Sequence, residues 1–256
     1  MMQWFIYSLV LLMGVPSATD DVLNAENVYC DHLGNVYLLE SNRLVKYNAD
    51  MELYAAYDCQ EQMITSVDVS DPLRILVYFA SAGEIVFLDK QMSPIGDPVS
   101  LDQLGYYDVT AACSASRGGF WLFDSRSRQI VHIDQYGESG LTTPVVDQFS
   151  GLPEQLQEHN SKLYLGFPGK AVLVFNAMGA YQKTLPFPYR QEFILIDNFL
   201  VFLNDRSLMA YNLRLAMESL LVSEVDAWDD YCLNKENLLY LKDGKLKFRQ
   251  WENTPF

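Results

Sequence analysis

The stretch GGFWLFDSRSRQIVHID, residues 118–134, decides the fold because its pattern recurs along the chain. An apolar strand around an aromatic residue is followed by a short polar turn and a second apolar strand, which closes on Asp134. Six such first strands centre on Tyr37, Tyr78, Trp121, Tyr164, Phe202 and Tyr240. Successive marker aromatics follow one another at nearly equal intervals, so the chain repeats one unit of nearly constant length.

The second strands of the repeat close, with one exception, on Asn or Asp. They are LVKYN (44–48), IVFLD (85–89), IVHID (130–134), VLVFN (172–176), LMAYN (208–212) and LKFRQ (246–250). A repeat of roughly 40 residues built from short strands is typical of a β-propeller blade. No apolar period of about 3.6 residues persists outside the N-terminal stretch, which excludes helical folds. A β-sandwich would not require six equal cycles. The sequence therefore predicts an all-β fold, a six-bladed β-propeller of four-stranded antiparallel blades.

A propeller hides its sheet edges only if the ring is closed. The sixth repeat supplies three clear strands, DDYCLN, NLLYLK and KLKFR. We expect the segment from Asp20 to Asn24 to pair as the outer strand of blade six. Local pairing by Trp251 to Asn253 is the alternative.

The N-terminal stretch WFIYSLVLLMGV, residues 4–15, has no charge and is too short to span a membrane, which takes about 20 apolar residues. It resembles the apolar core of a secretory signal, with small residues at Ser17 and Ala18. We expect residues 1–18 to be a signal peptide, with a cut after Ser17, and residues 19–256 to form one propeller domain. The protein is then periplasmic or secreted. The alternative is a buried first strand of a cytosolic protein.

The net charge of −15 disfavours nucleic acid and anionic membranes as partners, because both would be repelled. Four cysteines are present, and no CxxC or Cys/His cluster suggests zinc. Cys30, Cys113 and Cys232 occupy nearly the same place ahead of the marker aromatic of their repeats, which indicates buried positions near the axis. Blades one and six are neighbours in a closed ring, so a Cys30–Cys232 disulfide is one option; the state of Cys59 is open.

Acidic residues recur ten positions before the marker aromatics. The positions hold Asn27, Asp68, Ala111, Glu154, Glu192 and Asp230. Two more, Asp108 and Asp229, lie close by in the sequence. We expect an axial acidic ring at one mouth of the channel, made of Asp68, Asp108, Glu154, Glu192, Asp229 and Asp230. Such a ring would focus a negative potential that attracts a cation or a basic peptide. The alternative is that these are ordinary polar loop ends of an acidic protein.

The loops that lead into the innermost strands also collect aromatic residues. They are Tyr57, Tyr106, Tyr107, Phe149, Tyr189 and Trp228. Rigid aromatic side chains on one face are typical of interface anchors. We expect these six to form a partner-binding face; the alternative is that each packs between blades.

No nucleophile motif, phosphate-binding loop or calcium loop is present. The stretches SDPLRILVYF (70–79) and GGFWLFD (118–124), each followed by its apolar partner strand, resemble exported bacterial six-bladed propellers of the TolB-like and NHL-like kind. That resemblance implies a non-catalytic protein-binding scaffold of the cell envelope, with a protein partner and no cofactor. A minority of such proteins are calcium-dependent lactonases or esterases. For that alternative the resemblance would place an axial metal on Asn27, Asp68, Glu154, Glu192 and Asp230. The lactonase-type motifs are missing and Ala111 interrupts the ring, so an enzymatic role is disfavoured.

Overall fold

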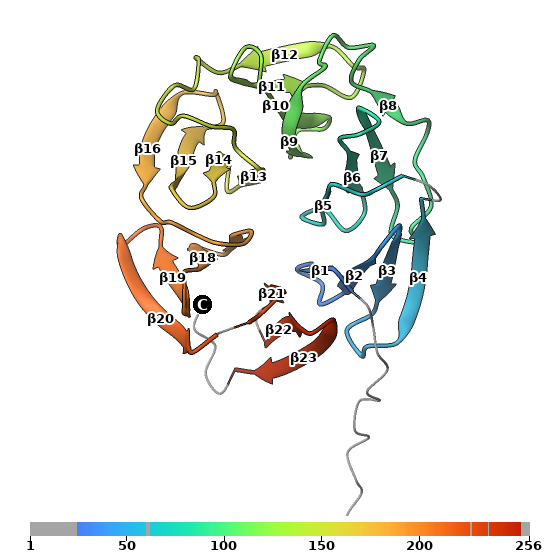
Figure 1. Cartoon of the computed structure of the whole chain (residues 1–256). Helices are drawn as coiled ribbons and strands as arrows, with labels where there is room; N and C mark the ends of the chain where they lie inside the picture. The colour runs from blue at the N-terminus through green and yellow to red at the C-terminus, as the bar shows by residue number, and fades with distance from the viewer. Residues whose placement is uncertain (1–24, 60–61, 226, 235, 252–256) are drawn as a thin grey trace, which may run out of the picture.

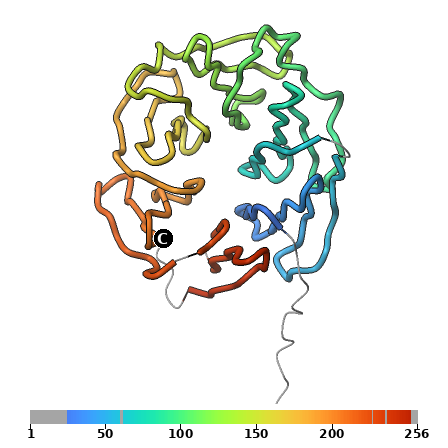
Figure 2. The backbone as a smooth tube through the Cα atoms, in the orientation of Figure 1, coloured from blue at the N-terminus to red at the C-terminus, as the bar shows by residue number. Residues whose placement is uncertain are grey.

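The computed structural model describes residues 25–59, 62–225, 227–234 and 236–251. They form six antiparallel sheets arranged as blades around one axis, and no helix occurs in these ranges (Figures 1 and 2). The predicted six-bladed β-propeller is therefore confirmed. No helix of the described residues is long and apolar enough to cross a membrane.

Each blade runs from an inner strand near the axis to an outer strand at the rim (Figure 1). Blade one is β1 (Asn27–Cys30), β2 (Val36–Glu40), β3 (Arg43–Tyr47) and β4 (Leu53–Asp58). Blade two is β5 (Ser66–Asp68), β6 (Ile75–Phe79), β7 (Glu84–Leu88) and β8 (Val99–Ser100). Blade three is β9 (Val109–Ser114), β10 (Phe120–Asp124), β11 (Gln129–Ile133) and β12 (Ser139–Thr142).

The second half of the ring follows the same plan. Blade four is β13 (Gln155–His159), β14 (Lys162–Phe167), β15 (Ala171–Asn176) and β16 (Tyr181–Leu185). Blade five is β17 (Ile194–Ile196), β18 (Phe199–Leu203), β19 (Ser207–Asn212) and β20 (Met217–Ser223). In blade six the described residues form β21 (Asp230–Leu233), β22 (Asn237–Lys242) and β23 (Lys245–Gln250).

The marker aromatics lie in the second strand of each blade, and five of the six are buried. Strands β6 and β10 are buried along their whole length, because a neighbouring blade covers each face of the sheet. This double cover explains why these strands are continuous apolar runs rather than alternating ones. An apolar cluster fills each of the six junctions between neighbouring blades.

The Asn and Asp residues that close the second strands of the repeat begin the turn to the outer strand. Asp134 Oδ1 accepts the backbone N–H groups of Tyr136 and Glu138 at 2.8 and 2.9 Å. Asn176 Oδ1 accepts those of Met178 and Ala180 in the same way. A side chain that bonds the backbone two and four residues later fixes a tight turn. The recurrent Asn or Asp is thus a turn-forming residue.

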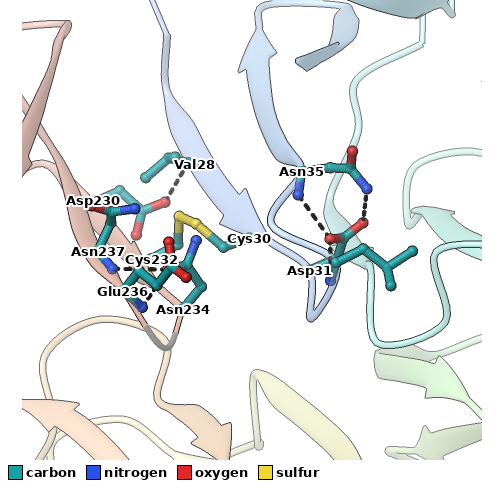
Figure 3. Close-up of a disulfide and its surroundings, with 10 residues drawn as sticks. Val28, Cys30, Asp31, Asn35, Asp230, Cys232, Asn234, Glu236 and Asn237 are labelled. Carbon is teal, nitrogen blue, oxygen red and sulfur yellow. Dashed lines mark hydrogen bonds between the residues drawn. A yellow bond between two sulfur atoms is a disulfide. The ribbon is translucent and has the colours of Figure 1, made fainter. Parts of the chain in front are cut away.

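Blades one and six meet through a disulfide and a hydrogen bond (Figure 3). An apolar cluster also fills this junction. Cys30 of β1 and Cys232 of β21 form a disulfide, with Cα atoms 5.5 Å apart. Next to it, Asp230 Oδ2 accepts the N–H of Val28 at 2.8 Å. The predicted closing segment, Asp20 to Asn24, lies outside the described residues. Of the alternative segment only Trp251 is described, and its N–H donates to Glu236 O at 3.1 Å, which extends β23 along β22.

Candidate functional site

The inner strands surround an axial channel that contains a cavity of about 130 Å³. Strands β1, β5, β13 and β21 and residues 192–195 of blade five contribute its walls. A smaller space of about 20 Å³ lies beside it, between blades two, three and four, and shares Asp68 and Glu192 with it. The channel is therefore a space where residues of several blades converge.

Three carboxylates of the predicted acidic ring, Asp68, Glu192 and Asp230, lie together in this channel, and Glu154 lines the smaller space. Glu192 keeps accessible surface, but it exposes that surface inside the channel, where protein surrounds it. Desolvation, followed by the charges of Asp230 and Asp68, raises the pKa of Glu192 to about 8. The channel therefore favours the protonated form of this carboxyl group.

The other two channel carboxylates are tied to neighbouring blades. Burial raises the pKa of Asp230 to about 6, although hydrogen bonds from Val28 N–H and its neighbours oppose the shift. Asp68 Oδ2 accepts the N–H of Ser114 in blade three at 2.8 Å, and burial raises its pKa as well. Each of these two groups therefore joins one blade to the next while it lines the channel.

Two members of the predicted ring are not in the channel, and this part of the prediction is wrong. Asp108 is exposed and forms an ion pair with Arg126 Nε at 2.6 Å. Asp229 precedes β21, and its Oδ2 accepts the N–H of Gly244 at 3.2 Å. Their carboxylates bond instead to residues in the β10–β11 and β22–β23 turns of their own blades.

Asp68 reaches the channel from the opposite end of its strand. The constant offset from the marker aromatic predicts the same mouth for all members of the ring, which is where the inner strands start, but Asp68 is the last residue of β5. In blade two the marker Tyr78 pairs with Ser66. In blade one the marker Tyr37 pairs with Tyr29, and fewer residues separate the two members of this pair along the chain. The hairpin of blade two is thus longer than that of blade one, so a constant offset from the marker does not reach the same level in every blade.

The set proposed for an axial calcium ion does not converge. Within the described ranges no three His, Cys, Asp or Glu side chains come close enough to hold a metal ion. Asp68 and Asp230 accept hydrogen bonds from backbone N–H groups of neighbouring blades. Asn27, the first residue of β1, hydrogen-bonds to Asp230. Glu192 lies with Asp68 and Asp230 along the channel, whereas Glu154 lines the smaller space, so the five residues do not form one ligand shell.

The predicted aromatic face divides into one exposed residue and several packed ones. Tyr107 is 57% exposed, and its ring lies under Arg126, whose guanidinium carbon is 5.1 Å from the ring centroid. Arg126 is itself held by Asp108. The neighbouring Tyr106 is half-buried and donates its hydroxyl to Ser139 Oγ at 3.1 Å. Tyr107 is therefore an exposed ring in contact with the side chain of Arg126.

The other aromatic residues of the set are mostly wedges between blades. The ring of Trp228 stacks on Tyr240 with centroids 4.3 Å apart, and Phe149 packs on Phe167 at 5.4 Å. Tyr57 packs against the cluster between blades one and two. All three are half-buried and present only part of each ring to solvent.

Tyr189 was expected on this face, and that expectation is wrong. Its side chain is only 2% exposed and meets Phe193 edge-on at 5.5 Å. Gly166 of β14 makes room for it, because a Cβ atom there would lie 2.2 Å from the Tyr189 hydroxyl. Tyr189 belongs to the core between blades four and five.

Sequence reasoning missed a second group of exposed apolar residues at the opposite end of the propeller. Since neighbouring strands are antiparallel, the turns before the outer strands lie at the end away from Tyr107. These turns of blades three, four and five carry Tyr136, Met178 and Leu215, all at least 66% exposed. Each donates its backbone N–H to the Asn or Asp that begins its turn. The detectable signal is a large apolar residue two or three positions after that Asn or Asp.

No family model matches the sequence, and no relative was found among curated proteins. Solved structures do resemble the chain. A streptogramin B lyase is 12% identical, with a TM-score of 0.59, over 90% of this chain and 84% of its own. BamB from Moraxella catarrhalis is 11% identical, with a TM-score of 0.55, over 89% and 85%. The Pan2 WD40 domain of Neurospora crassa is 10% identical, with a TM-score of 0.58, over 93% and 80%. At such low identity the likeness shows a shared propeller fold.

Proposed function

We propose that this protein is an exported, non-catalytic scaffold of the bacterial cell envelope that binds a protein partner. It contacts the partner through its loop face, the end of the propeller formed by the connections into the inner strands. The observation that carries the proposal is Tyr107. An exposed tyrosine ring offers a large contact area and has only two rotatable side-chain bonds, so it loses little conformational entropy in a complex, which makes it suited to be an interface anchor.

Other residues of the same connections support the loop face. Met63, Val145 and Leu152 precede inner strands of blades two and four, and all three are exposed. Exposed apolar residues that gather on one face are typical of interaction sites. Tyr106, Phe149 and Trp228 add partly exposed rings, while Tyr189 does not contribute. Met63, Val145 and Leu152 thus extend the surface around Tyr107 with further apolar contacts.

Two features support export. The apolar stretch of residues 4–15 resembles a secretory signal. The Cys30–Cys232 disulfide joins the first and last blades, and stable disulfides are typical of oxidising compartments such as the periplasm. We propose cleavage after Ser17. N-terminal sequencing of protein from the envelope fraction should find Ala18 or Thr19; an intact Met1 would contradict export with cleavage.

The loop face is tested by Tyr107→Ala beside Tyr136→Ala. Both remove an exposed tyrosine ring, and Tyr136 lies at the opposite end of the propeller. A partner is first captured from envelope extract on immobilised mature protein, and its affinity for each variant is then measured with purified components. We expect Tyr107→Ala to weaken binding by roughly 2 kcal/mol, about 30-fold, with Tyr136→Ala nearly neutral. The reverse order would place the binding site on the other end and refute the loop face.

A further inference from the structure

The outer edge of blade six is open among the described residues. The other five blades each end in an outer strand that pairs with the third, whereas blade six ends at β23 on the rim (Figure 1). The pairing of β23 with β22, continued by Trp251, directs the backbone groups of Lys245, Lys247 and Arg249 towards β22. The N–H and C=O groups of the alternating residues, Leu246, Phe248 and Gln250, then point outward. An edge of this kind is a template for another strand.

This edge is basic in an acidic protein. Lys242, Lys245, Lys247 and Arg249 are four of the 18 lysine and arginine residues, and the net charge of the chain is −15. None of the four forms an ion pair within the described part of the chain. Residues 245, 247 and 249 alternate along the strand, so they share one face of the sheet. Their charges repel a second edge of the same kind but attract a strand that carries carboxylates on that face.

The connections of the other blades leave only a short stretch of the N-terminal segment for a strand at this edge. Among the described blades the shortest connection from an outer strand to the next inner strand has six residues, 224–229. If a connection of at least six residues also separated an N-terminal outer strand from β1, that strand would end at residue 20 or earlier, since β1 starts at Asn27. Cleavage after Ser17 would leave residues 18–20 for it. The outer strands of blades one, three, four and five have four to seven residues, and only β8 is shorter.

The last described residue, Trp251, continues β23 along β22 and does not turn onto the outer edge. Trp251 is partly buried against the cluster between blades five and six, towards the neighbouring blade. Its N–H is directed to Glu236 at the inner side of the strand. Among the described residues, no strand therefore pairs with the outer edge of β23.

We propose that the outer edge of β23 binds an extended, acidic segment of a partner protein. The segment adds a fourth strand to blade six by backbone pairing with Leu246, Phe248 and Gln250, and its carboxylates lie beside Lys245, Lys247 and Arg249. The exposed ring of Phe248 offers an apolar contact on the other face of the strand. This surface is separate from the loop face, so it adds a second binding site to the proposed scaffold, and either binding site can be refuted without the other. The proposal for the β23 edge rests on the cleavage after Ser17 that is part of the proposed function.

The test uses the mature protein and an octapeptide, blocked at both ends, in which glutamate and valine alternate. Titration calorimetry measures its affinity for the wild type, for Arg249→Glu and for the matched control Arg117→Glu, another exposed arginine on a turn of blade three. We expect binding to weaken at least tenfold in Arg249→Glu and less than twofold in Arg117→Glu. A peptide N-methylated at alternate residues, which cannot donate to the edge, should bind at least tenfold more weakly than its parent.

Four results would overturn the proposal. The wild type fails to bind the peptide; the two arginine variants lose affinity equally; the N-methylated peptide binds as well as its parent; or an eight-nucleotide thymidine strand binds as tightly as the peptide, which indicates a general polyanion site. A further variant, which lacks residues 18–24, tests whether the chain's own N-terminal segment pairs with β23. If only that variant binds the peptide, the chain's own segment covers β23, and the partner strand is excluded.

Discussion

At the scale of single residues, the close approach of Tyr189 to Gly166 decides how blades four and five pack. A Cβ atom at Gly166 would lie 2.2 Å from the Tyr189 hydroxyl and 2.8 Å from Phe193. Gly166→Ala should therefore lower the free energy of unfolding by about 1–3 kcal/mol, the usual cost of overpacking. Denaturant unfolding measures it, with Gly140→Ala as control, because a Cβ there meets nothing closer than 3.4 Å. Equal losses in both variants would show that strand glycines are sensitive for another reason.

The channel carboxyl groups make a second prediction at this scale. Glu192 has a pKa of about 8 in the folded protein against 4.5 in an unfolded chain, so the folded state binds the extra proton between these values. The free energy of unfolding should therefore fall as the pH rises from about 4.5 to 8, and Asp230, with a pKa of about 6, adds to the fall. Glu192→Gln removes the group that loses its proton last.

Thermal melting of Glu192→Gln and wild type should give similar midpoints at pH 5 and a higher midpoint for the variant at pH 9. The surface variant Glu138→Gln is the control and should follow the wild type at both values. If Glu192→Gln followed the wild type across the whole range, the channel would not hold the proton as described.

The residues of the site show why sequence reasoning reached only part of it. A constant offset from the marker found Glu192 and Asp230 because the hairpins of blades five and six have similar lengths. It misplaced Asp68, whose hairpin is longer. It could not detect that Tyr189 turns inward, because that depends on a missing side chain at Gly166, far away in sequence. Exposure of an aromatic ring depends on the neighbouring blade, which the local sequence does not contain.

At the scale of elements, the turn before each outer strand depends on its Asn or Asp. Asp134→Ala removes the acceptor for the N–H groups of Tyr136 and Glu138, which solvent then satisfies. We expect a loss of about 1 kcal/mol in the free energy of unfolding, because these bonds are exposed and each contributes modestly. Gln135→Ala, in the same turn, is the control. An unchanged stability in Asp134→Ala would mean that the recurrent residue is not needed for the turn.

Most elements of this fold were predictable because their signals are local. The apolar second strand of each repeat and the Asn or Asp that closes it are adjacent in the sequence. The same pattern recurs from repeat to repeat, so each repeat supports the strands predicted in the others. The outer strand β8 has the weakest sequence signal of the elements. It has only two residues, and a separate bridge joins Leu88 to Pro94. It lies at the rim, where no second blade covers it and where the sequence needs no apolar run.

At the scale of the whole molecule, the ring depends on how its first and last blades are joined. Blade six contributes three described strands, and its junction with blade one is held by the apolar cluster around Val28 and Leu239, by Asp230 and by the Cys30–Cys232 disulfide. The disulfide spans 202 residues, nearly the entire propeller. A cross-link over so long a loop strongly restricts the unfolded chain.

Replacing both cysteines by alanine should therefore lower the free energy of unfolding by about 5 kcal/mol on the chain-entropy account. Denaturant unfolding of oxidised wild type, reduced wild type and the double variant measures this. The reduced wild type should resemble the double variant, because both lack the cross-link. The remaining cysteines, Cys59 and Cys113, are buried and unpaired, so Cys113→Ala serves as a control that should respond to oxidant and reductant as the wild type does. If reduction left the wild type unchanged, the apolar cluster and Asp230 alone would close the ring, and the disulfide would no longer support an oxidising compartment.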